Sequence, residues 1–367
     1  MVMETDTGGI DAGGLATGGI EGIDVEGIDV DGVTAWFADH VDGVTPPLEF
    51  SLIAGGHSNL TFAVSDAASD TTGRRWVLRR PPLGQGLATA HEMGREHRII
   101  SALGPTDVPV PPAVVLCTDK TVNGAPFYVM DLVDGLVLRD LSATTALNLE
   151  QRRAAGDSLV DVLARIHAVD PDAVGLGDLG RKEGYIERQL KRWYGQWENC
   201  KTRDLPAVDE VHDILLAAVP EQGPAAIVHG DYRLDNCLVD GTGQVVAVLD
   251  WEICTLGDPL ADVGLLSVYW TERGDPHPAL LNAPTLAEGF PGRAALLDRY
   301  AELSGRDLSA IDFYVAFGYW KLACILEGVY ARYVGGAMGT GSTGFEGFAE
   351  QVRLLAEAAR TNAEKIG

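Results

Sequence analysis

The spacing of apolar residues changes along the chain from the period of strands to that of helices. In the N-terminal third, short apolar runs bounded by Gly, Pro and Asp predict strands. These runs are Phe50–Ile53, Leu60–Val64, Trp76–Leu78, Ala113–Cys117 and Pro126–Leu132. A helix is predicted over residues 88–103, where apolar side chains share one side and Gly104-Pro105 follows. The pattern predicts a small lobe of about five antiparallel strands and one helix.

The rest of the chain has mostly helical periodicity. Residues 148–169 and Ile311–Tyr333 repeat apolar side chains every three or four positions. Between these predicted helices lie two short apolar runs, Ala226–Val228 and Val245–Leu249, which predict strands. They frame a loop dense in polar residues. Loops held by a rigid scaffold often carry binding and catalytic side chains, so we expect function to concentrate there.

Residues 1–33 differ from everything that follows. They are rich in Gly, carry eight acidic and no basic residues, and repeat the pentapeptide EGIDV at Glu21–Val25 and Glu26–Val30. A segment with high net charge and few large apolar side chains cannot bury enough surface to fold, so we predict a disordered acidic tail over residues 1–33. A short amphipathic helix is predicted to begin at Thr34 and to end near Gly43.

The chain is strongly acidic. Its 367 residues include 53 Asp and Glu against 28 Lys and Arg, a net charge of −25. Nucleic acids and anionic membranes attract basic proteins, so the sequence argues against both as partners. No apolar run approaches the roughly 20 residues that span a bilayer, and no basic residue precedes an apolar stretch at the start. We therefore expect a cytoplasmic protein, and the sequence leaves its oligomeric state open.

The cysteines give no sign of a metal or redox centre. Five are scattered along the chain, and none forms a Cys-x-x-Cys pair. We expect free thiols.

The polar loop carries a pattern suited to phosphoryl transfer. It reads HGDYRLDN over residues 229–236, and one hairpin later the chain reads LDWE over residues 249–252. Phosphoryl transfer needs a carboxylate that orients and deprotonates the attacking hydroxyl, and oxygen ligands that hold Mg²⁺ on the nucleotide phosphates. Asp231 suits the first task, and Asn236 and Asp250 suit the second.

These motifs, together with GDPLAD over residues 257–262, resemble the aminoglycoside phosphotransferase family. The resemblance runs from near Leu48 to the C-terminal helices. It implies an α+β, protein-kinase-like fold of two lobes, a small antiparallel β-sheet lobe and a larger, mostly helical lobe. We accordingly expect a nucleotide-binding lobe over residues 34–133, after the acidic tail, and a helical lobe with the catalytic loop and the substrate pocket over residues 134–367.

The resemblance implies a phosphate-binding turn between the first two strands. Gly55 and Gly56 would let the backbone approach phosphates, and Ser58 and Asn59 would offer donors. By itself such a turn is also typical of an ordinary hairpin.

The resemblance also implies an adenine site where the last strand of the small lobe runs into the connection between the lobes. Backbone groups of Asp131 and Val133 would face the adenine edge, and Met130 would lie behind it. Met130 is equally well explained as a core residue.

The third strand departs from the family pattern. Kinase-like folds carry a lysine there, which binds the phosphates and pairs with a glutamate of the following helix. Here Arg79 takes the lysine position, and Glu96 is the expected partner. Arginine is not interchangeable with lysine, because its planar head can grip phosphate in a bidentate way but sits differently.

Other polar residues have structural explanations. Asp262 resembles the family's aspartate that ties down the catalytic loop, and His229 is expected to pack and to bond to the backbone. Arg233 would neutralise charge near the transferred phosphate, in a catalytic role, or would form a salt bridge with Asp235. His167 is expected to be a core histidine with its hydrogen bonds satisfied.

The resemblance implies an enzyme that uses Mg²⁺ and moves the γ-phosphate of ATP or GTP to a hydroxyl of a small molecule. The LRRPP run at residues 78–82 and the GDPLADVG stretch at residues 257–264 look like the branch of the family joined to acyl-CoA dehydrogenases, for which hydroxyacyl acceptors fit. The acidic surface favours cationic acceptors instead, such as aminoglycosides or amino alcohols. The alternative is a catalytically weak kinase-like protein that binds a nucleotide or metabolite, and Arg79 argues for it.

Overall fold

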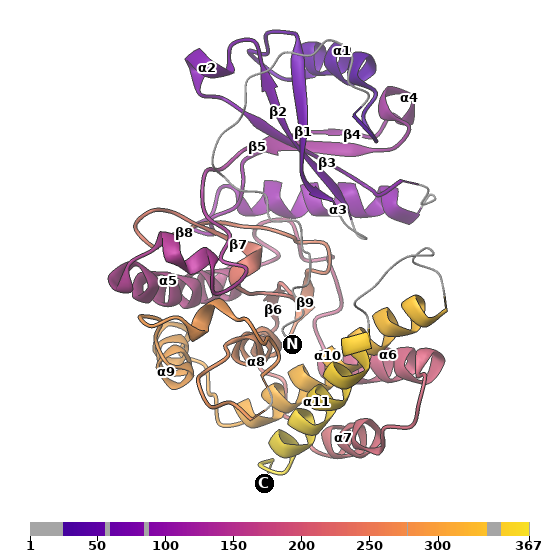
Figure 1. Cartoon of the computed structure of the whole chain (residues 1–367), viewed down its shortest axis with the longest axis vertical. Helices are drawn as coiled ribbons and strands as arrows, with labels where there is room; N and C mark the ends of the chain where they lie inside the picture. The colour runs from indigo at the N-terminus through magenta and orange to yellow at the C-terminus, as the bar shows by residue number, and fades with distance from the viewer. Residues whose placement is uncertain (1–24, 56–58, 84–87, 277, 336–345, 367) are drawn as a thin grey trace. The chain divides into compact units, whose positions relative to one another are not determined.

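The structure is a computed structural model, and it describes residues 25–55, 59–83, 88–276, 278–335 and 346–366. The chain divides into two units (Figure 1). The first contains the chain up to Asp134 and the segment Leu249–Glu252, and the second contains Gly135–Val248 and the chain from Ile253.

The sequence assigned the segment Leu249–Glu252 to the helical lobe, but the structure groups it with the first unit. Ion pairs accompany this grouping, since the carboxylates of Asp250 and Glu252 both lie within 4 Å of Arg79, which belongs to the first unit.

The first unit is built on a five-stranded sheet in which every neighbouring pair is antiparallel (Figure 1). The strands follow the predicted apolar runs closely. In order across the sheet they are β1 (Leu48–Gly55), β2 (Leu60–Asp66), β3 (Trp76–Arg80), β5 (Phe127–Asp131) and β4 (Ala113–Cys117). Both faces of β3 are buried, as expected for the middle strand of a covered sheet.

Different helices cover the two faces of this sheet. On one face, Trp76 and Leu78 of β3 share a core with Phe37 of α1 (Val30–His40). Successive residues of a strand point to opposite faces, so Arg79 points to the other face. There it contacts Glu96 of α3 (Ala88–Leu103), a helix that also packs against β4 and β5. Two single-turn helices, α2 (Ser69–Thr72) and α4 (Lys120–Asn123), lie in the connections.

Helix α1 begins inside the stretch predicted as an acidic tail. Asp29 caps it, because its carboxylate accepts a hydrogen bond from the Gly32 N–H. Ile28 and Val33 are buried in the core of the first unit. The folded chain therefore starts earlier than the predicted boundary at residue 33, because these apolar positions pack on the sheet despite the Gly and Asp residues around them. Residues 1–24 of the predicted tail lie outside the described residues.

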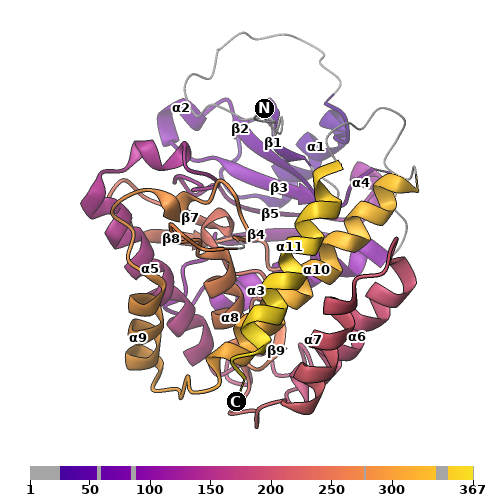
Figure 2. The same cartoon turned by 60° about the horizontal axis from the view of Figure 1, so that its bottom comes forward.

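The second unit is mostly helical. Its helices are α5 (Leu149–Ala168), α6 (Tyr185–Cys200), α7 (Pro206–Ala217), α8 (Leu260–Tyr269), α9 (Arg293–Ser304), α10 (Ile311–Val334) and α11 (Glu346–Ala363). Side chains of α6, α7, α8, α10 and α11 form one core, and α10 lies beside α11 (Figure 2). In the parts of the chain that the structure describes, no helix is long and apolar enough to cross a membrane.

Two short strand pairs hold the polar loop of the second unit. β6 (Ala226–Val228) pairs with β9 (Thr255–Gly257), and β7 (Cys237–Val239) pairs with β8 (Val245–Val248), all antiparallel. The predicted strands correspond to β6 and β8. The polar segment that they frame contains a 3-10 turn, Leu234–Asn236, which leads into β7.

Helices α8 and α10 cross closely at Gly264. A Cβ atom at this position would lie 2.5 Å from the backbone of Tyr314, so only glycine permits the observed distance between the two helix backbones. The crossing matters for the site, because side chains of both helices bind the polar loop. Taken together, the antiparallel sheet of one unit and the helices of the other confirm the predicted α+β fold class.

Candidate active site

Asp231 lies in the second unit, in the loop that leaves β6. The preceding Gly230 has a φ of +87°, a conformation that an L side chain rarely adopts. The glycine therefore lets the chain turn sharply out of the strand, and the turn presents Asp231 with a side chain that is 27% exposed.

Asp262, in the first turn of α8, holds the backbone of this loop. Its Oδ2 accepts a hydrogen bond from His229 N at 2.7 Å, and its Oδ1 accepts one from Gly230 N at 2.8 Å. Burial alone would raise the pKa of Asp262. Hydrogen bonds from His167 and from the loop backbone outweigh burial, and the pKa of Asp262 lies below its usual value. The carboxylate thus stays ionised, and the predicted structural role of Asp262 is confirmed.

His167 has the role expected of a core histidine. Its ring is buried, with Nδ1 2.7 Å from the Tyr300 hydroxyl and Nε2 3.3 Å from Asp262 Oδ2. Burial lowers the pKa of His167, so the neutral ring donates to Asp262 through Nε2 and accepts from Tyr300.

Lys321 of α10 holds the same loop from a second helix, and the sequence analysis missed it. Its Nζ donates to the Gly230 carbonyl oxygen at 3.0 Å, and the ammonium lies 5.8 Å from the centre of the Trp193 ring. Burial lowers the pKa of Lys321, while Asp231 and Asp262 act in the opposite direction. A single lysine in an apolar helical run is the signal that could have drawn attention to it.

Both oxygens of the Asp231 carboxylate accept hydrogen bonds. Tyr269 of α8 donates its hydroxyl to Oδ1 at 3.0 Å, and Asn236 donates Nδ2 to Oδ2 at 3.0 Å. The same amide nitrogen also donates to the Asp231 carbonyl at 2.8 Å. The structure therefore brings the predicted pair Asp231 and Asn236 together and adds Tyr269, for which no sequence motif argued.

Arg233 forms a salt bridge with Asp235, which the sequence analysis gave as the alternative to a catalytic role. Its Nη2 lies 3.0 Å from Asp235 Oδ2, and its Nε lies 3.6 Å from Asp231 Oδ2. The guanidinium also lies over the Tyr269 ring, 4.8 Å from its centre. Burial raises the pKa of Asp235, and the charge of Arg233 opposes that shift. Arg233 thus places a positive charge beside the Asp231 carboxylate.

In the first unit, Arg79 pairs with Glu96 as predicted. Arg79 Nε lies 3.2 Å from Glu96 Oε2, and the Glu96 side chain is 1% exposed. Although burial opposes it, the negative charges of Glu96 and Asp250 raise the pKa of Arg79 above its ordinary value. Glu96 also accepts a hydrogen bond from the Tyr128 hydroxyl, so the buried carboxylate has two partners.

Asp250 joins this group and adopts a strained backbone. Its Oδ1 lies 2.5 Å from Arg79 Nη2, and its φ is +63°. Within the described ranges it is the one non-glycine residue with positive φ. Such strain costs of order 1–3 kcal/mol and tends to persist where function requires the geometry. Asp250 is therefore held in a rare conformation with its carboxylate on the Arg79 guanidinium.

The predicted phosphate turn is described only in part. Gly55 is the last residue of β1, opposite Leu60, whereas Gly56 and Ser58 lie outside the described residues. Asn59 donates Nδ2 to Glu252 Oε2 at 3.1 Å. Asn59, which directly precedes β2, is thereby bonded to the segment that carries Asp250.

Pairing within the sheet reduces the number of backbone groups that are available to bind adenine. The Asp131 N–H donates to the Pro112 carbonyl at 2.9 Å, so it is not available to a ligand. Of the Asp131 backbone groups, only the carbonyl remains a predicted contact of adenine. Val133 follows in the connection that leaves β5, and Met130 is 7% exposed, in agreement with its core explanation.

The described residues contain no cluster of three or more His, Cys, Asp and Glu side chains placed to hold a metal ion. Magnesium commonly takes only one or two protein ligands, so the absence of such a cluster among the described residues does not argue against a magnesium site.

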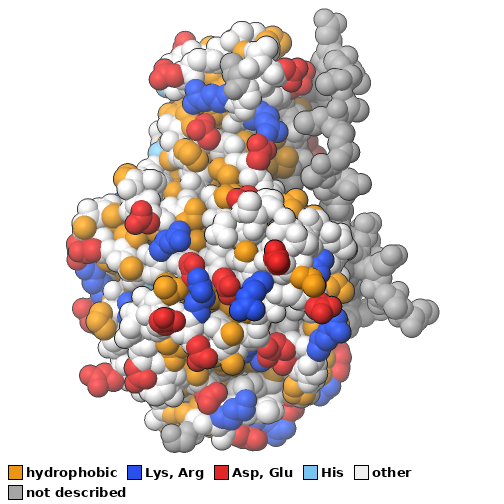
Figure 3. Space-filling view, turned by 90° about the vertical axis from the view of Figure 1, so that its left-hand side faces the viewer, with side chains coloured by type: hydrophobic (Ala, Val, Ile, Leu, Met, Phe, Trp, Pro, Cys, Tyr) orange, Lys and Arg blue, Asp and Glu red, His pale blue; other side chains and the backbone are white. Residues whose placement is uncertain are grey.

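Acidic and basic side chains are interspersed over the face drawn in Figure 3, so the described residues there form no single acidic patch.

The sequence matches the model of the phosphotransferase enzyme family over residues 49–303. Among curated proteins, the mouse (Mus musculus) protein named acyl-CoA dehydrogenase family member 10 is 36% identical over 302 residues, which cover 80% of this chain and 27% of the mouse protein. The chain thus spans little more than a quarter of that relative's length.

Solved structures agree with this match. The crystal structure of a candidate aminoglycoside phosphotransferase from Ralstonia eutropha is 34% identical, with a TM-score of 0.79 over 92% of this chain and 99% of that one. An aminoglycoside phosphotransferase in complex with ADP and hygromycin B shares the fold alone, at 16% identity and a TM-score of 0.59 over 90% of this chain and 98% of that one. The predicted family resemblance, its acyl-CoA dehydrogenase branch and the kinase-like fold are confirmed.

Proposed function

Because the chain belongs to the phosphotransferase enzyme family, we propose that it transfers the γ-phosphoryl group of ATP or GTP to a hydroxyl group of a small molecule. The observation that carries the proposal is the Asp231 carboxylate, which is partly exposed and is fixed by hydrogen bonds to both of its oxygens. A carboxylate held in this way is suited to orient a hydroxyl and to accept its proton.

In the proposed reaction, Asp231 accepts the proton of the acceptor hydroxyl. The acceptor oxygen forms a bond to the γ-phosphorus, and the bond from that phosphorus to the bridging oxygen of the β-phosphate breaks, which releases ADP or GDP. Arg233 lies 3.6 Å from Asp231 and would offset negative charge that develops on the transferred group. General-base assistance contributes about 10²–10⁴-fold, so most of the acceleration would come from positioning and electrostatic stabilisation.

The proposal assigns magnesium binding to Asn236 and Asp250, whose amide and carboxylate oxygens are hard ligands of the kind that Mg²⁺ prefers. The contacts of each residue fit this assignment. Asn236 donates through Nδ2 to Asp231, which turns its Oδ1 away from Asp231. Asp250 uses Oδ1 for Arg79 and retains lone pairs on its carboxylate for a metal. When bound, the ion neutralises charge on the nucleotide phosphates.

Nucleotide binding is assigned to the first unit. Arg79, backed by Glu96, would contact the phosphates together with the turn at Gly55, Gly56, Ser58 and Asn59. The Asp131 carbonyl and backbone groups of Val133 would face the edge of the base, and Met130 would lie behind it. The ADP complex of the structural relative supports a nucleotide as the phosphoryl donor.

Two classes of acceptor remain in the proposal. The relatives named for acyl-CoA dehydrogenases support a hydroxyacyl compound. The family and the Ralstonia eutropha structure support an aminoglycoside or a related amino alcohol. We therefore propose a screen of both acceptor classes, with hydroxyacyl compounds, aminoglycosides and amino alcohols tested against [γ-³²P]ATP and [γ-³²P]GTP.

Two variants test the site. Asp231→Asn should keep Mg-nucleotide binding and lose phosphoryl transfer, whereas Asp307→Asn, at an exposed turn before α10, should retain transfer. Asp250→Ala should lose the Mg-dependent thermal stabilisation by nucleotide, which amounts to about 2.7 kcal/mol at 100 times the dissociation constant. Full turnover in Asp231→Asn would overturn the assignment of the base.

The second candidate function is a catalytically weak protein that binds a nucleotide or a metabolite. The Arg79–Asp250 ion pair favours it, because the arginine occupies the lysine position and already contacts a residue assigned to the metal. This reading requires a nucleotide-dependent rise in melting temperature without transfer to any acceptor in the screen.

A further inference from the structure

Helix α8 reaches the Asp231 loop at both of its ends. Asp262 lies in its first turn and Tyr269 is its last residue, seven positions later. Seven residues make nearly two turns at about 3.6 residues per turn, so the two side chains leave the same face of the helix. Asp262 binds the backbone N–H groups of His229 and Gly230, and Tyr269 binds the side chain of Asp231. One rigid helix thus holds both the loop and its carboxylate.

The Tyr269 hydroxyl restrains a motion that the other contacts leave free. Asn236 donates to Oδ2 of Asp231, and this single bond permits the carboxylate to rotate about its Cβ–Cγ bond. The bond from Tyr269 to Oδ1, also 3.0 Å long, fixes the second oxygen. With one donor on each oxygen, the plane of the carboxylate is set, and so are the directions of its remaining lone pairs.

Tyr269 itself is held in place. The guanidinium of Arg233 covers one face of its ring. Burial raises the pKa of Tyr269 well above its ordinary value, and the negative charge of Asp231 acts in the same direction, so the hydroxyl keeps its proton and remains a donor.

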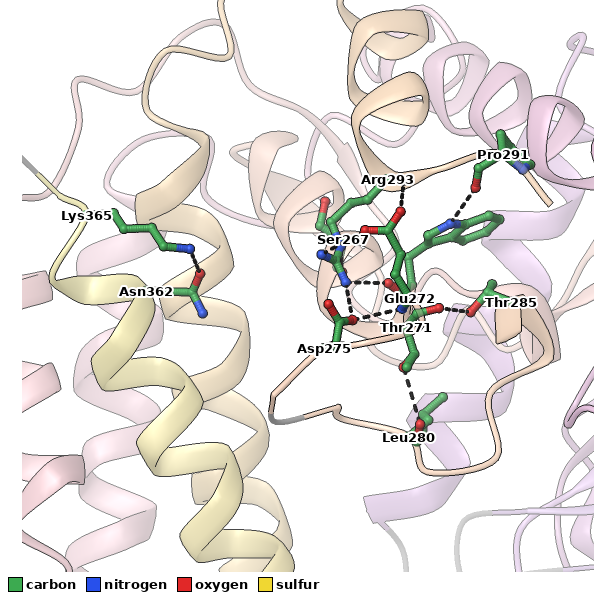
Figure 4. A network of polar contacts seen from close by, with 11 residues as sticks. Ser267, Thr271, Glu272, Asp275, Leu280, Thr285, Pro291, Arg293, Asn362 and Lys365 are labelled. Carbon is green, nitrogen blue, oxygen red and sulfur yellow. Dashed lines mark hydrogen bonds and ion pairs between the residues drawn. The ribbon is translucent and has the colours of Figure 1, made fainter. Parts of the chain in front are cut away.

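The last turn of α8 is clamped by Arg293 (Figure 4). Its Nε donates to the Ser267 carbonyl at 3.0 Å, and its Nη2 donates to the Trp270 carbonyl at 2.7 Å. These carbonyls flank Tyr269 in the sequence and belong to a helix end, where carbonyls lack partners within the helix. Asp275 accepts from Arg293 Nη2 at 2.6 Å and completes the clamp. A cation at a helix C-terminus also stabilises it electrostatically, so the turn that carries Tyr269 is secured.

We infer that Tyr269 is a positioning residue of phosphoryl transfer, whose hydroxyl sets the orientation of the Asp231 carboxylate toward the acceptor. The inference rests on the proposed function, in which Asp231 accepts the acceptor's proton. Tyr269 acts through Asp231, and its contribution is made in the step where the proton is transferred. A misplacement of about 1 Å in a reacting group can lower a rate about 10²-fold, so loss of the hydroxyl should be visible in kcat.

The test compares Tyr269→Phe with Tyr314→Phe. Both variants remove a hydroxyl that donates to an aspartate in the second unit, since Tyr314 donates to Asp258 Oδ2 at 2.6 Å. Tyr269→Phe should lower kcat about 10- to 100-fold and leave the KM values for nucleotide and acceptor within about two-fold. Tyr314→Phe should keep kcat near that of the wild type, although it also loses a buried hydrogen bond. Equal losses of kcat in the two variants, or a wild-type kcat in Tyr269→Phe, would overturn the inference.

A double-variant cycle supplies a readout that a merely structural role would not change. In the Asp231→Asn background, Tyr269→Phe should have no further effect on the residual kcat, because the hydroxyl acts through the carboxylate. Independent effects of the two substitutions would contradict the inference while the proposed function stands. Full activity of Asp231→Asn alone would overturn the proposed function and this inference with it.

Discussion

The Arg79 guanidinium forms an ion pair with Asp250, in which 2.5 Å separates Nη2 from Oδ1. At the same time Arg79 Nε lies 3.2 Å from Glu96. An ammonium group is a point charge, whereas the guanidinium fork presents donors along two edges. One arginine side chain therefore joins the carboxylate of α3 to the carboxylate of the segment 249–252. This double contact is a physical reason for an arginine at the position where kinase-like folds carry a lysine.

Arg79→Met is expected to lower the free energy of unfolding by about 3–5 kcal/mol, because it leaves the Glu96 carboxylate buried without a counter-charge. Adding Glu96→Gln should recover part of this loss, with a coupling energy of about 0.5–3 kcal/mol. Urea unfolding of the single and double variants measures both quantities.

Arg75→Met is the matched control. Arg75 pairs with Asp134 at the surface, where the two side chains are 36% and 82% exposed. Its loss should change the free energy of unfolding by no more than about 1 kcal/mol. Strictly additive effects of Arg79→Met and Glu96→Gln would show that the buried pair is not coupled.

Gly264→Ala is expected to destabilise the second unit by more than about 2 kcal/mol, since the new Cβ would lie 2.5 Å from the Tyr314 backbone and would force α8 and α10 apart. Gly195→Ala in α6 is the control, because a Cβ there meets nothing within 4 Å. It should be neutral or should stabilise by up to about 1 kcal/mol through helix propensity. Thermal unfolding compares the two, and equal effects would contradict the close crossing.

The stability of the protein should fall as the pH drops below about 6.5, because burial lowers the pKa of His167 in the folded state. The unfolded chain then binds a proton that the folded chain excludes. Below the ordinary histidine pKa, this difference removes about 1.4 kcal/mol per pH unit, until the folded-state pKa is reached.

His167→Gln should remove this part of the dependence. Its free energy of unfolding, measured by urea titration from pH 7.5 to 5, should fall less steeply than that of the wild type. His40→Gln, a substitution in an exposed ring, controls for the loss of a histidine. Parallel curves for wild type and His167→Gln would refute the buried neutral histidine.

A chain that starts at residue 34 should be less stable than one that starts at residue 25. The longer chain keeps Ile28 and Val33, which are buried, and the Gly27 carbonyl, which accepts a hydrogen bond from Arg80. Burial of one Val or Ile side chain contributes about 1.5–3 kcal/mol, so the difference should reach at least about 2 kcal/mol. Equal melting temperatures would mean that this segment adds nothing to the fold.

The local pattern of apolar and turn residues predicted strands and helices well where an apolar run is bounded by turn residues. The runs Ala113–Cys117 and Ala226–Val228 match β4 and β6 residue for residue, and the helix predicted over residues 88–103 is α3. Prediction was wrong at the start of α1, where Gly and Asp residues around Ile28 and Val33 conceal two core positions. Propensity is a weak guide there, because packing against the sheet outweighs it.

The candidate site was predictable to the extent that it is a motif. The HGDYRLDN and LDWE motifs indicated Asp231, Asn236 and Asp250, and the structure brings Asn236 onto Asp231 and Arg79 onto Glu96. Tyr269 and Lys321 were missed, because each lies in an apolar helix far along the chain from the residue that it binds. The i, i+7 spacing of Asp262 and Tyr269 was a signal, but it acquires meaning only once α8 is known to lie along the loop.

The sequence by itself determined the family, the α+β class and the candidate catalytic and ligand-binding residues. These depend on periodicity and on motifs, which neighbouring positions along the chain supply. Only the tertiary structure decided which donor fixes which oxygen: Tyr269 and Asn236 on Asp231, Lys321 on the Gly230 carbonyl, and Arg79 on Asp250. Such pairings depend on where helices cross and strands pair, and a crossing as close as that at Gly264 is set by packing across the whole unit.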